Sequence, residues 1–301
     1  MPAPFLCIGI PVRNEEESIA LTINSIVSSR AWTSAKQNRE LVVCLNGSTD
    51  NTLNVLNSLK GKIPELRIIY SNADFGKTGA LNEIAKRANL RASEIYFSDG
   101  DVLVQKDTIT KTLRALKEKG IEFAAPIIWP RRAGAKPTLT ETLYEESIKI
   151  AAKEKLHSLT GMGFAVKRKF FLQNPLPLGR QVGDDRFINY AWSEKIRVVH
   201  NARIIFNPPS LIDHYRARVR HHRRKKVMME QFPWLRQAMI KVSAKRNPRA
   251  MAFLKGLSAR GKAGFILNQA AETIAAVTSL APTKDHWPRL KSTKIGYVKK
   301  R

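Results

Sequence analysis

The chain has 301 residues, 43% of them hydrophobic and 26% charged, which excludes a disordered tail and a fibrous repeat. Its formal net charge is +27 at pH 7. Most of the excess lies towards the C-terminus, because residues 213–301 contain 22 Lys and Arg against four Asp and Glu. A positive field of this kind favours an anionic partner, such as a phosphate group, a nucleic acid or an acidic lipid.

The start of the chain and its two cysteines give expectations about location. Residues 1–18 lack the basic segment that opens a signal peptide and already contain three glutamates. No run of about 20 apolar residues is present, so we expect no membrane span. Cys7 and Cys44 each lie in an apolar, strand-like segment, where a buried free thiol is typical of a reducing compartment. These features predict a cytoplasmic protein, either free or attached to the inner face of the membrane.

Short apolar segments alternate with helical patterns over residues 5–125. The pattern predicts strands over 5–10, 40–45, 66–70, 94–98 and 121–128, and helices over 15–29, 50–59, 76–88 and 107–119. Strands that alternate with helices of this length are joined by right-handed crossovers into a parallel sheet. The predicted fold class is therefore α/β, with a mostly parallel sheet flanked by helices.

The later residues carry a more mixed pattern. They predict a helix near 140–155, a strand over 161–168, a helix after the acidic turn 183–186, and strands over 196–200 and 202–206. Beyond two prolines, a strand-like segment that ends at His214 precedes the basic run 216–226, and helical patterns then continue to about residue 281, before a basic tail. We therefore expect two domains, a sheet domain over 1–212 and a basic, largely helical region over 213–301.

Polar clusters follow several of the predicted strands. They lie at residues 11–15, 46–50 and 99–101, and in the loop at Gly76 and Lys77. The carboxyl ends of parallel strands meet at one edge of an open α/β sheet, and ligands bind beyond that edge. The clusters therefore predict one site.

Asp99 and Asp101 directly follow the strand over 94–98. Two carboxylates one residue apart can hold a hard divalent cation and leave its other positions for water and diphosphate oxygens. A turn with helix-capping carboxylates would explain the same residues without a ligand.

Two other loops offer groups for a nucleotide. Asn46 and Asp50 can hydrogen-bond a base or a ribose, although an ordinary turn and helix cap would also explain them. Lys77 lies on a glycine-rich loop at the start of a helix, where backbone N–H groups and a cation can bind phosphate. The spacing of a Walker A loop is absent.

Asp184 and Asp185 are adjacent acids at the start of a predicted helix. Like charges side by side raise the pKa of one carboxyl, which suits a general base, whereas acids also stabilise a helix N-terminus without any catalytic role. Arg218 and Arg220 lie in the basic run, which can bind phosphate or form a solvated surface. His214, just before this run, is either structural or a metal ligand.

Six segments, taken in order, resemble the nucleotide-sugar-dependent glycosyltransferases of family 2, which have a GT-A fold. They are residues 10–19, 44–52, 76–82, 98–101, 161–168 and 182–190, the last being most similar to chitooligosaccharide and hyaluronan synthases. The resemblance implies a hexosyltransferase-type enzyme that moves a sugar, with inversion, from a nucleotide-sugar to a hydroxyl acceptor. It further implies that UDP is the nucleotide. The acceptor in cell-envelope polysaccharide or glycoconjugate synthesis would be a glycan or, as the basic C-terminal third indicates, a lipid-linked molecule.

The resemblance also implies roles for individual residues. Asp185 would be the base that deprotonates the acceptor, with Asp184 as its neighbour, and the metal would be Mn²⁺ or Mg²⁺. Asn46 replaces an Asp that commonly meets the uracil, which puts the identity of the base in doubt. The donor-binding residues would be Pro11, Arg13, Glu15, Asn46, Lys77, Asp99, Arg218 and Arg220, and the metal ligands would be Asp101, Asp99 and His214.

One departure from the family bears on the product. Processive synthases carry a Gln-x-x-Arg-Trp motif, whereas residues 217–221 here lack both the Gln and the Trp. The chain also lacks the membrane spans of such synthases, so we expect a single addition or a short product. The basic C-terminal region would attach the enzyme to an anionic membrane surface.

Three alternatives stay open at this point. The charge would suit a nucleic-acid-binding protein, but carboxylates that line a cleft repel a phosphate backbone unless a metal intervenes. A sugar nucleotidyltransferase also uses an α/β sheet and a metal, but its glycine-rich opening loop is absent. The third alternative is a binding module without activity. We therefore expect no nucleic-acid partner.

Overall fold

The computed structural model describes residues 5–71, 76–131, 136–153, 158–179, 182–244 and 255–280, together with residue 294. The chain forms two compact units. The first unit comprises Met1–Ile128 and Ser158–Ile205, and the second comprises Trp129–His157 and Phe206–Arg301. The two domains expected over residues 1–212 and 213–301 are a catalytic part and a basic part, and this functional division stays a prediction.

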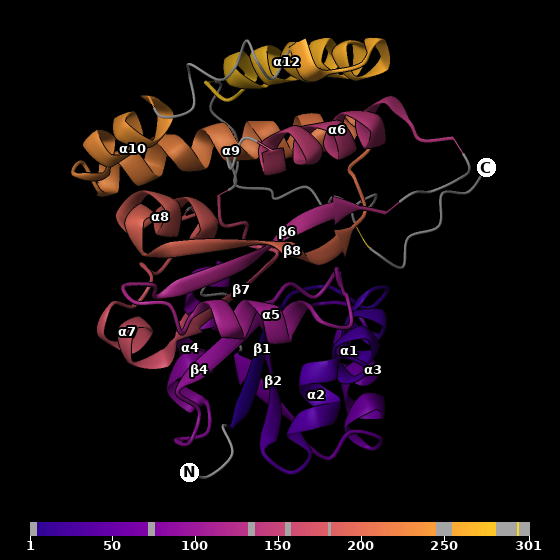
Figure 1. Cartoon of the computed structure of the whole chain (residues 1–301), viewed down its shortest axis with the longest axis vertical. Helices are drawn as coiled ribbons and strands as arrows, with labels where there is room; N and C mark the ends of the chain where they lie inside the picture. The colour runs from indigo at the N-terminus through magenta and orange to yellow at the C-terminus, as the bar shows by residue number, and fades with distance from the viewer. Residues whose placement is uncertain are drawn as a thin grey trace. The chain divides into compact units, whose positions relative to one another are not determined.

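The first half of the sheet is parallel. It consists of β1 (Leu6–Val12), β2 (Arg39–Asn46), β3 (Leu66–Ser71) and β4 (Glu94–Ser98), in the order β3-β2-β1-β4. These strands are drawn in indigo and purple in Figure 1. β1 and the centre of β2, residues 41–45, are apolar and buried, as expected of parallel strands that are covered on both faces.

The second half of the sheet contains antiparallel pairs. Four further strands continue the order as β7-β6-β8-β5, and β7 pairs antiparallel with both β4 and β6, as β5 does with β8. They are β5 (Leu103–Val104), β6 (Phe123–Pro130), β7 (Gly163–Lys167) and β8 (Ile196–Phe206). The predicted α/β class is confirmed, but β7 runs against both of its neighbours and β5 runs against β8, and residues 196–206 form one strand instead of two.

Helices cover the sheet of the first unit. They are α1 (Ile19–Val27), α2 (Arg30–Ala35), α3 (Thr52–Lys60), α4 (Gly76–Arg87), α5 (Thr108–Ala115), α7 (Arg168–Gln173), α8 (Asp184–Ala191) and the short η1 (Ser193–Lys195). α4 packs on β1 and β2 so closely that a Cβ on Gly9 would lie 2.6 Å from Ile84 Cγ2. The core contains fully buried aromatic and branched side chains such as Phe97, Phe164 and Ile8, each worth about 1.5–3 kcal/mol of apolar burial.

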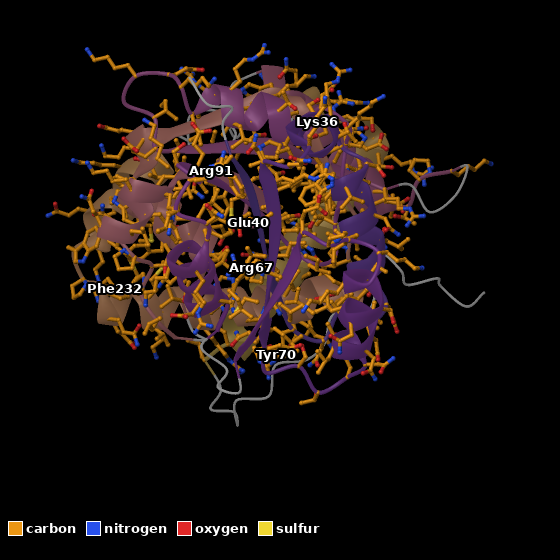
Figure 2. All side chains as sticks on the ribbon, turned by 90° about the horizontal axis from the view of Figure 1, so that it is seen from below. Lys36, Glu40, Arg67, Tyr70, Arg91 and Phe232 are labelled. Carbon is orange, nitrogen blue, oxygen red and sulfur yellow. The ribbon has the colours of Figure 1, made fainter. Side chains whose placement is uncertain are left out.

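An ion pair between a buried glutamate and a half-exposed arginine joins two of the parallel strands. Glu40 on β2 is buried, and Arg67 Nη1 on β3 lies 2.6 Å from its Oε2 atom. Figure 2 shows these two labelled side chains next to each other. Glu40 also accepts a hydrogen bond from the backbone N–H of Asn89, so its carboxylate is doubly satisfied. The pair stabilises the register of β2 against β3, because a slipped register would leave a buried charge unpaired.

The second unit is helical in its described part. It contains α6 (Leu139–Lys153), α9 (Leu211–Gln231), α10 (Leu235–Ala244) and α12 (Ala259–Thr278). α12 packs along α9 and α6 (Figure 1). No helix among the residues that the structure describes combines the length and apolar character needed to cross a bilayer.

The basic run lies inside α9, and one prediction about its start is wrong. Residues 211–214 form the first turn of this helix instead of a strand-like segment, because Ser210 Oγ accepts the backbone N–H of Asp213 at 3.2 Å and caps it. The basic tail after residue 281 lies outside the described residues, apart from Lys294.

Candidate active site

The loops that follow β1 and β2 are bonded to each other at the carboxyl edge of the sheet. The backbone N–H of Asn14 donates to Ser48 Oγ at 3.0 Å, and Asn14 Oδ1 accepts the N–H of Thr49 at 2.8 Å. The N–H of Glu15 donates to Thr52 Oγ1, also at 2.8 Å. The polar clusters that the sequence places at two separate strand ends therefore form one continuous edge.

The loop after β4 joins the same edge. A Cβ on Gly100 would lie 3.2 Å from Glu15 Cγ, so the Asp99-Gly100-Asp101 segment packs against the loop after β1. The carbonyl of Gly100 accepts a hydrogen bond from Thr22 Oγ1 at 2.9 Å, and the N–H of Asp99 donates to Met162 O at 3.0 Å. These bonds fix the two carboxylates at the end of the central strand.

Lys77 is the centre of the site. Its Nζ atom lies 2.6 Å from Asp99 Oδ1 and 3.1 Å from Asp184 Oδ2, and it donates to the carbonyl of Gly161 at 2.7 Å. Three predicted site residues, which come from α4, the end of β4 and the start of α8, are thus brought together. Each of the three side chains is no more than 28% exposed, so the cluster is mostly shielded from water.

Gly161 is a site residue that the sequence reasoning missed. A Cβ at this position would lie 2.8 Å from Asp184 Oδ2 and 3.1 Å from Lys77 Nζ. Only glycine leaves enough room for the carboxylate and the ammonium beside the backbone. The available signal was the Gly-Met-Gly sequence over residues 161–163, which the family resemblance places on the acceptor side without predicting a contact of Gly161 with the cluster.

Asn189 is a second residue that was missed. Its side-chain Nδ2 donates to the carbonyls of Asp185, at 2.6 Å, and Leu159, at 2.7 Å, while its Oδ1 accepts the N–H of Leu159 at 3.1 Å. It therefore ties the first turn of α8 to the loop that carries Gly161. Its position four residues after Asp185, on the same helix face, was the only signal in the sequence.

The carboxylates of the cluster have perturbed pKa values. Burial raises the pKa of Asp99 to about 7; the charges of Asp101 and Asp184 act in the same direction, and that of Lys77 opposes them. The pKa of Asp185 is also raised, first by burial and then by Asp184, against the effect of Lys77 and Arg186. Groups with pKa values displaced in this way concentrate at functional sites.

Burial and the neighbouring carboxylates also shift the pKa of Lys77, but here the two effects oppose each other. Burial alone would lower the pKa of its ammonium, but the carboxylates of Asp184 and Asp99 raise that pKa above its usual value. The lysine therefore stays charged and balances part of the negative charge of the cluster. Buried carboxylates without such a partner would cost several kcal/mol each.

The residues predicted to line the nucleoside pocket occupy the same edge. Pro11 lies within β1, Arg13 is exposed in the loop after it, and Glu15 is buried. Asn46 at the end of β2 is also buried, and its Nδ2 donates to the carbonyl of Gly76 at 2.9 Å, which anchors the start of α4. Their contacts with a nucleoside stay predictions.

The remaining predicted residues belong to the second unit. Arg218 Nε donates to His214 Nε2 at 3.2 Å and lies 3.1 Å from Glu272 Oε2. Burial, and then the charge of Arg218, lower the pKa of His214 below its usual range, while Glu272 and Asn268 oppose the shift. Arg220 lies two residues further along the same helix. The metal role of His214 and the diphosphate role of both arginines stay predictions.

The donor chemistry of the Asp99-Asp101 pair fits a divalent cation. The charges of Asp101 and Asp184 both act on Asp99, so three carboxylates share this part of the site. Among the described residues, no group of three or more His, Cys, Asp and Glu side chains is arranged to hold a metal ion. A cation here would therefore need oxygen ligands from elsewhere, and a diphosphate supplies such oxygens.

Known proteins share the first part of the chain. The family described as "Glycosyl transferase family 2" matches residues 7–173. Beta-monoglucosyldiacylglycerol synthase of Synechocystis sp. is 27% identical over 159 residues, which are 49% of this chain and 32% of that protein. The glycosyltransferase AglE of Haloferax volcanii is 25% identical over 120 residues, or 40% of this chain and 38% of that protein. The chain thus spans about a third of the length of these curated relatives.

Solved structures share the fold. The mannosyltransferase PcManGT from Pyrobaculum calidifontis, in complex with GDP-Man and Mn²⁺, superposes with a TM-score of 0.63 at 17% identity and covers 92% of this chain and 89% of that one. TarS of S. aureus (residues 1–349), in complex with UDP-GlcNAc, gives a TM-score of 0.51 at 15% identity, over 91% of this chain and 90% of that one.

The ordered motifs resemble one family, the structure brings Lys77, Asp99 and Asp184 together at the sheet edge, and the solved neighbours have the same fold. The family match spans more than half of the residues. The chain therefore belongs to glycosyltransferase family 2 and has a GT-A fold.

Proposed function

We propose that this chain transfers a sugar from a nucleotide-sugar donor to a hydroxyl group of an acceptor. The observation that carries the proposal is the cluster in which Lys77 contacts Asp99, Asp184 and Gly161 at the carboxyl edge of the sheet. Membership of family 2 supports the activity, as do the structural neighbours that were solved with GDP-Man and UDP-GlcNAc.

Asp185 is the general base of the proposed reaction. The acceptor oxygen attacks the anomeric carbon on the side opposite the nucleoside diphosphate, and the hydroxyl proton passes to the Asp185 carboxylate. The bond between the anomeric carbon and the diphosphate oxygen breaks with inversion. Burial and the neighbouring Asp184 raise the pKa of Asp185, which makes it a better proton acceptor than an exposed aspartate. Asn189 and the backbone N–H of Arg186 hold Asp185 in place.

Asp101 and Asp99 would hold Mn²⁺ or Mg²⁺, with His214 as a further expected ligand. Such a cation, when bound, supplies positive charge to the diphosphate. The Mn²⁺ in the mannosyltransferase complex supports a divalent ion in this fold, and the choice between the two metals is left to experiment.

Lys77 provides fixed positive charge beside the leaving group. Its ammonium is already held in position by Asp99 and Asp184, so it need not be reorganised when a donor phosphate binds beside it. Preorganised charge of this kind is usually the largest contribution to catalysis. Arg218 and Arg220 would add to it as diphosphate ligands.

UDP is the proposed nucleotide, and a glycan or lipid-linked hydroxyl is the proposed acceptor in cell-envelope synthesis. The preference for UDP rests on the family resemblance and is weakened by Asn46, which stands where an Asp commonly meets uracil. A membrane-proximal acceptor is supported by the name of the Synechocystis relative and by the basic character of α9. Lysines and arginines near an anionic leaflet contribute about 1 kcal/mol each to binding.

The experiment offers UDP-, GDP- and dTDP-sugars to the purified protein with Mn²⁺ or Mg²⁺ and measures the release of the nucleoside diphosphate. We expect slow, metal-dependent release from one class of donor, and faster release when a suitable acceptor is added. The same screen with nucleoside triphosphate and sugar phosphate measures pyrophosphate. Pyrophosphate formation without hydrolysis of any nucleotide-sugar would replace the proposal with a nucleotidyltransferase.

A further inference from the structure

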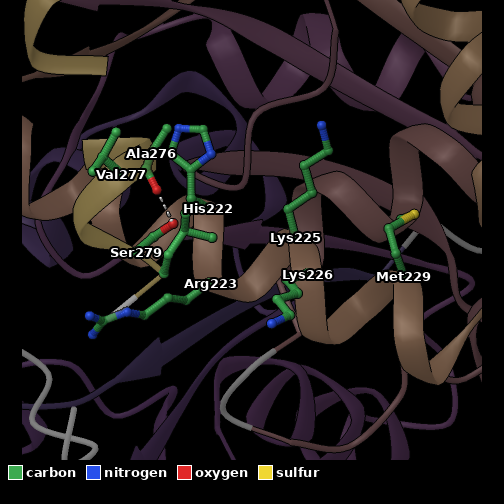
Figure 3. Close-up of a pocket in the computed structure, with 9 residues that line it drawn as sticks. His222, Arg223, Lys225, Lys226, Met229, Ala276, Val277 and Ser279 are labelled. Atoms are coloured by element: carbon green, nitrogen blue, oxygen red, sulfur yellow. Dashed lines mark hydrogen bonds between the residues drawn. The ribbon is translucent and has the colours of Figure 1, made fainter. Parts of the chain in front are cut away.

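α9 and α12 line an open hollow of about 450 Å³ in the second unit (Figure 3). Its basic side chains come from the second half of α9, and its apolar side chains come mainly from the end of α12. The residues that matter here are Arg223, Lys225, Lys226, Met229, Val277 and Leu280. One hollow therefore combines cationic groups with exposed apolar surface, and the proposed sugar transfer uses neither.

The hollow has an excess of positive charge. Residues 214–229 of α9 contain seven lysines and arginines and no acid. On α12 the nearest carboxylate, Glu272, already lies 3.1 Å from both Arg218 Nε and His222 Nε2. Lys225 and Lys226 are exposed, and neither forms an ion pair within the described part of the chain. Two cations are thus available to an external anion.

Arg223 is held in place at the rim of the hollow. Its Nη2 atom donates to the carbonyl of Thr278, at 3.4 Å, in the last turn of α12. The negative end of the helix dipole favours a guanidinium at this position. Ser279 Oγ donates to the carbonyl of Ala276 at 2.7 Å, which closes another of the helix-end carbonyls. The end of α12 is therefore preorganised beside the lysines.

The outer face of α12 carries an exposed apolar strip. Ile266, Ile274 and Val277 recur at helical spacing and are 57–67% exposed, and Leu280 just beyond the helix is 76% exposed. The strip runs along a 20-residue helix that does not meet the requirements of a membrane span. A helix of this kind, flanked by basic residues, suits the interface of a bilayer, where one face enters the acyl region.

We infer that this hollow binds the phosphate of an anionic phospholipid headgroup, while the apolar strip of α12 enters the same leaflet. The inference deepens the membrane-proximal part of the proposed function and rests on it. Charge complementarity selects the occupant, because Lys225 and Lys226 face an anion and Val277 and Leu280 face its acyl chains. A free phosphate would satisfy the cations but would leave the strip in water.

The test measures flotation of the full chain with phosphatidylcholine vesicles that contain or lack phosphatidylglycerol. Two variants probe the hollow, Lys225→Ala with Lys226→Ala, and Val277→Ser with Leu280→Ser. Two controls make changes of the same kind elsewhere. Lys60→Ala with Lys62→Ala replaces two exposed lysines, and Leu90→Ser replaces one apolar side chain that is 91% exposed. Circular dichroism and thermal unfolding show that each variant is folded.

We expect the unchanged chain to float only with the anionic vesicles. The lysine variant should lower the partition coefficient roughly thirtyfold, as two interfacial lysines would. The serine variant should also weaken binding, and the two controls should leave it unchanged. Binding of nucleoside diphosphate, measured separately, should be the same in all of them, so that a failure of this inference is distinguished from a failure of the proposed function.

Three outcomes would overturn the inference. The first is equal flotation with neutral and anionic vesicles. The second is release of the protein from the anionic vesicles by inorganic phosphate at a concentration equal to that of the lipid phosphate, which would show a site for free phosphate. The third is equal loss of flotation in the Lys60/Lys62 control, which would show that net charge alone, and not the hollow, drives binding.

Discussion

The two units use charge in opposite ways. In the first, carboxylates gather at the edge of a sheet, and one internal lysine at 2.6–3.1 Å balances them. In the second, cations crowd one helix, and Lys225 and Lys226 are exposed to water. Buried charges must be paired when the chain folds, whereas exposed charges cost little because water solvates them. The acidic cluster therefore has to be paired within the fold, whereas Lys225 and Lys226 on the basic helix are accessible to a partner.

This difference separates the chemistry from the attachment. Substitutions in the acidic cluster should change both activity and stability, because every member has a partner inside the protein. Substitutions of exposed lysines on α9 should change association alone. The following predictions test that contrast, from the largest expected effect to the smallest.

Replacement of the proposed base should give the largest effect. Asp185→Asn keeps the shape of the side chain and its bond with the Arg186 N–H, but it removes the proton acceptor. We expect the rate of transfer to fall by about 10²–10⁴-fold with donor binding retained. Single-turnover transfer and nucleotide titration separate the two quantities. An Asp185→Asn enzyme with normal turnover would remove this residue from the mechanism.

Removal of the central cation should destabilise the fold. Lys77→Met leaves Asp99 and Asp184 facing each other without a partner, and it should lower the free energy of unfolding by about 2–3 kcal/mol. The value is below that of a fully buried pair, because the lysine is 28% exposed. Lys86→Met, which breaks only a surface pair with Glu83, should cost about 0.5 kcal/mol or less. Chemical denaturation compares the two, and equal losses would contradict the internal role of Lys77.

Gly161 tests the packing of the cluster. In Gly161→Ala the new methyl group would press on Asp184 Oδ2 and Lys77 Nζ, so the cluster must shift. We expect a loss of about 1–3 kcal/mol of stability, as for an overpacked site, together with reduced transfer. Gly61→Ala is the matched control, since a Cβ there meets only one backbone oxygen at 3.7 Å. A fully active Gly161→Ala enzyme would mean that this close approach has no function.

The cysteines give the smallest effect. Cys7 and Cys44 are buried and free, as predicted, and burial raises the pKa of Cys44 to about 11. An unfolded thiol ionises near pH 8.5, so this shift lowers stability only as the pH rises above that value. At pH 8 both thiols should resist alkylation in the folded protein and react after unfolding. Rapid labelling of the native chain, read by mass spectrometry, would contradict their burial.

The sequence predicts the regular part of the fold well. The apolar runs locate β1 to β4 to within two residues, because each is buried on both faces and bounded by polar loops. The reversed direction of β7 escapes prediction, since an apolar run has the same pattern in parallel and antiparallel pairs. β5 and α2 are too short to show a period, and Ser210 begins α9 earlier than the basic run indicates.

The site was also predicted only in part. Charged residues at a strand end, such as Asp99, or at the start of the helix that follows a strand, such as Lys77, are visible in the sequence because the sheet topology gathers them. Gly161 and Asn189 are not, because their roles depend on a contact at 2.8 Å and on hydrogen bonds to backbone carbonyls. These contacts can be recognised only when the coordinates of the partner atoms are known.

Binding of UDP and GDP, with and without Mn²⁺, is the most direct measurement of where the donor sits. It should be made by calorimetry on the unchanged chain, on Asp101→Asn, and on Lys225→Ala with Lys226→Ala. We predict metal-dependent binding of one nucleotide that is lost in Asp101→Asn and retained in the lysine variant. Binding that survives Asp101→Asn but disappears with the two lysines would place the nucleotide on the basic helix and contradict a donor site at the acidic cluster.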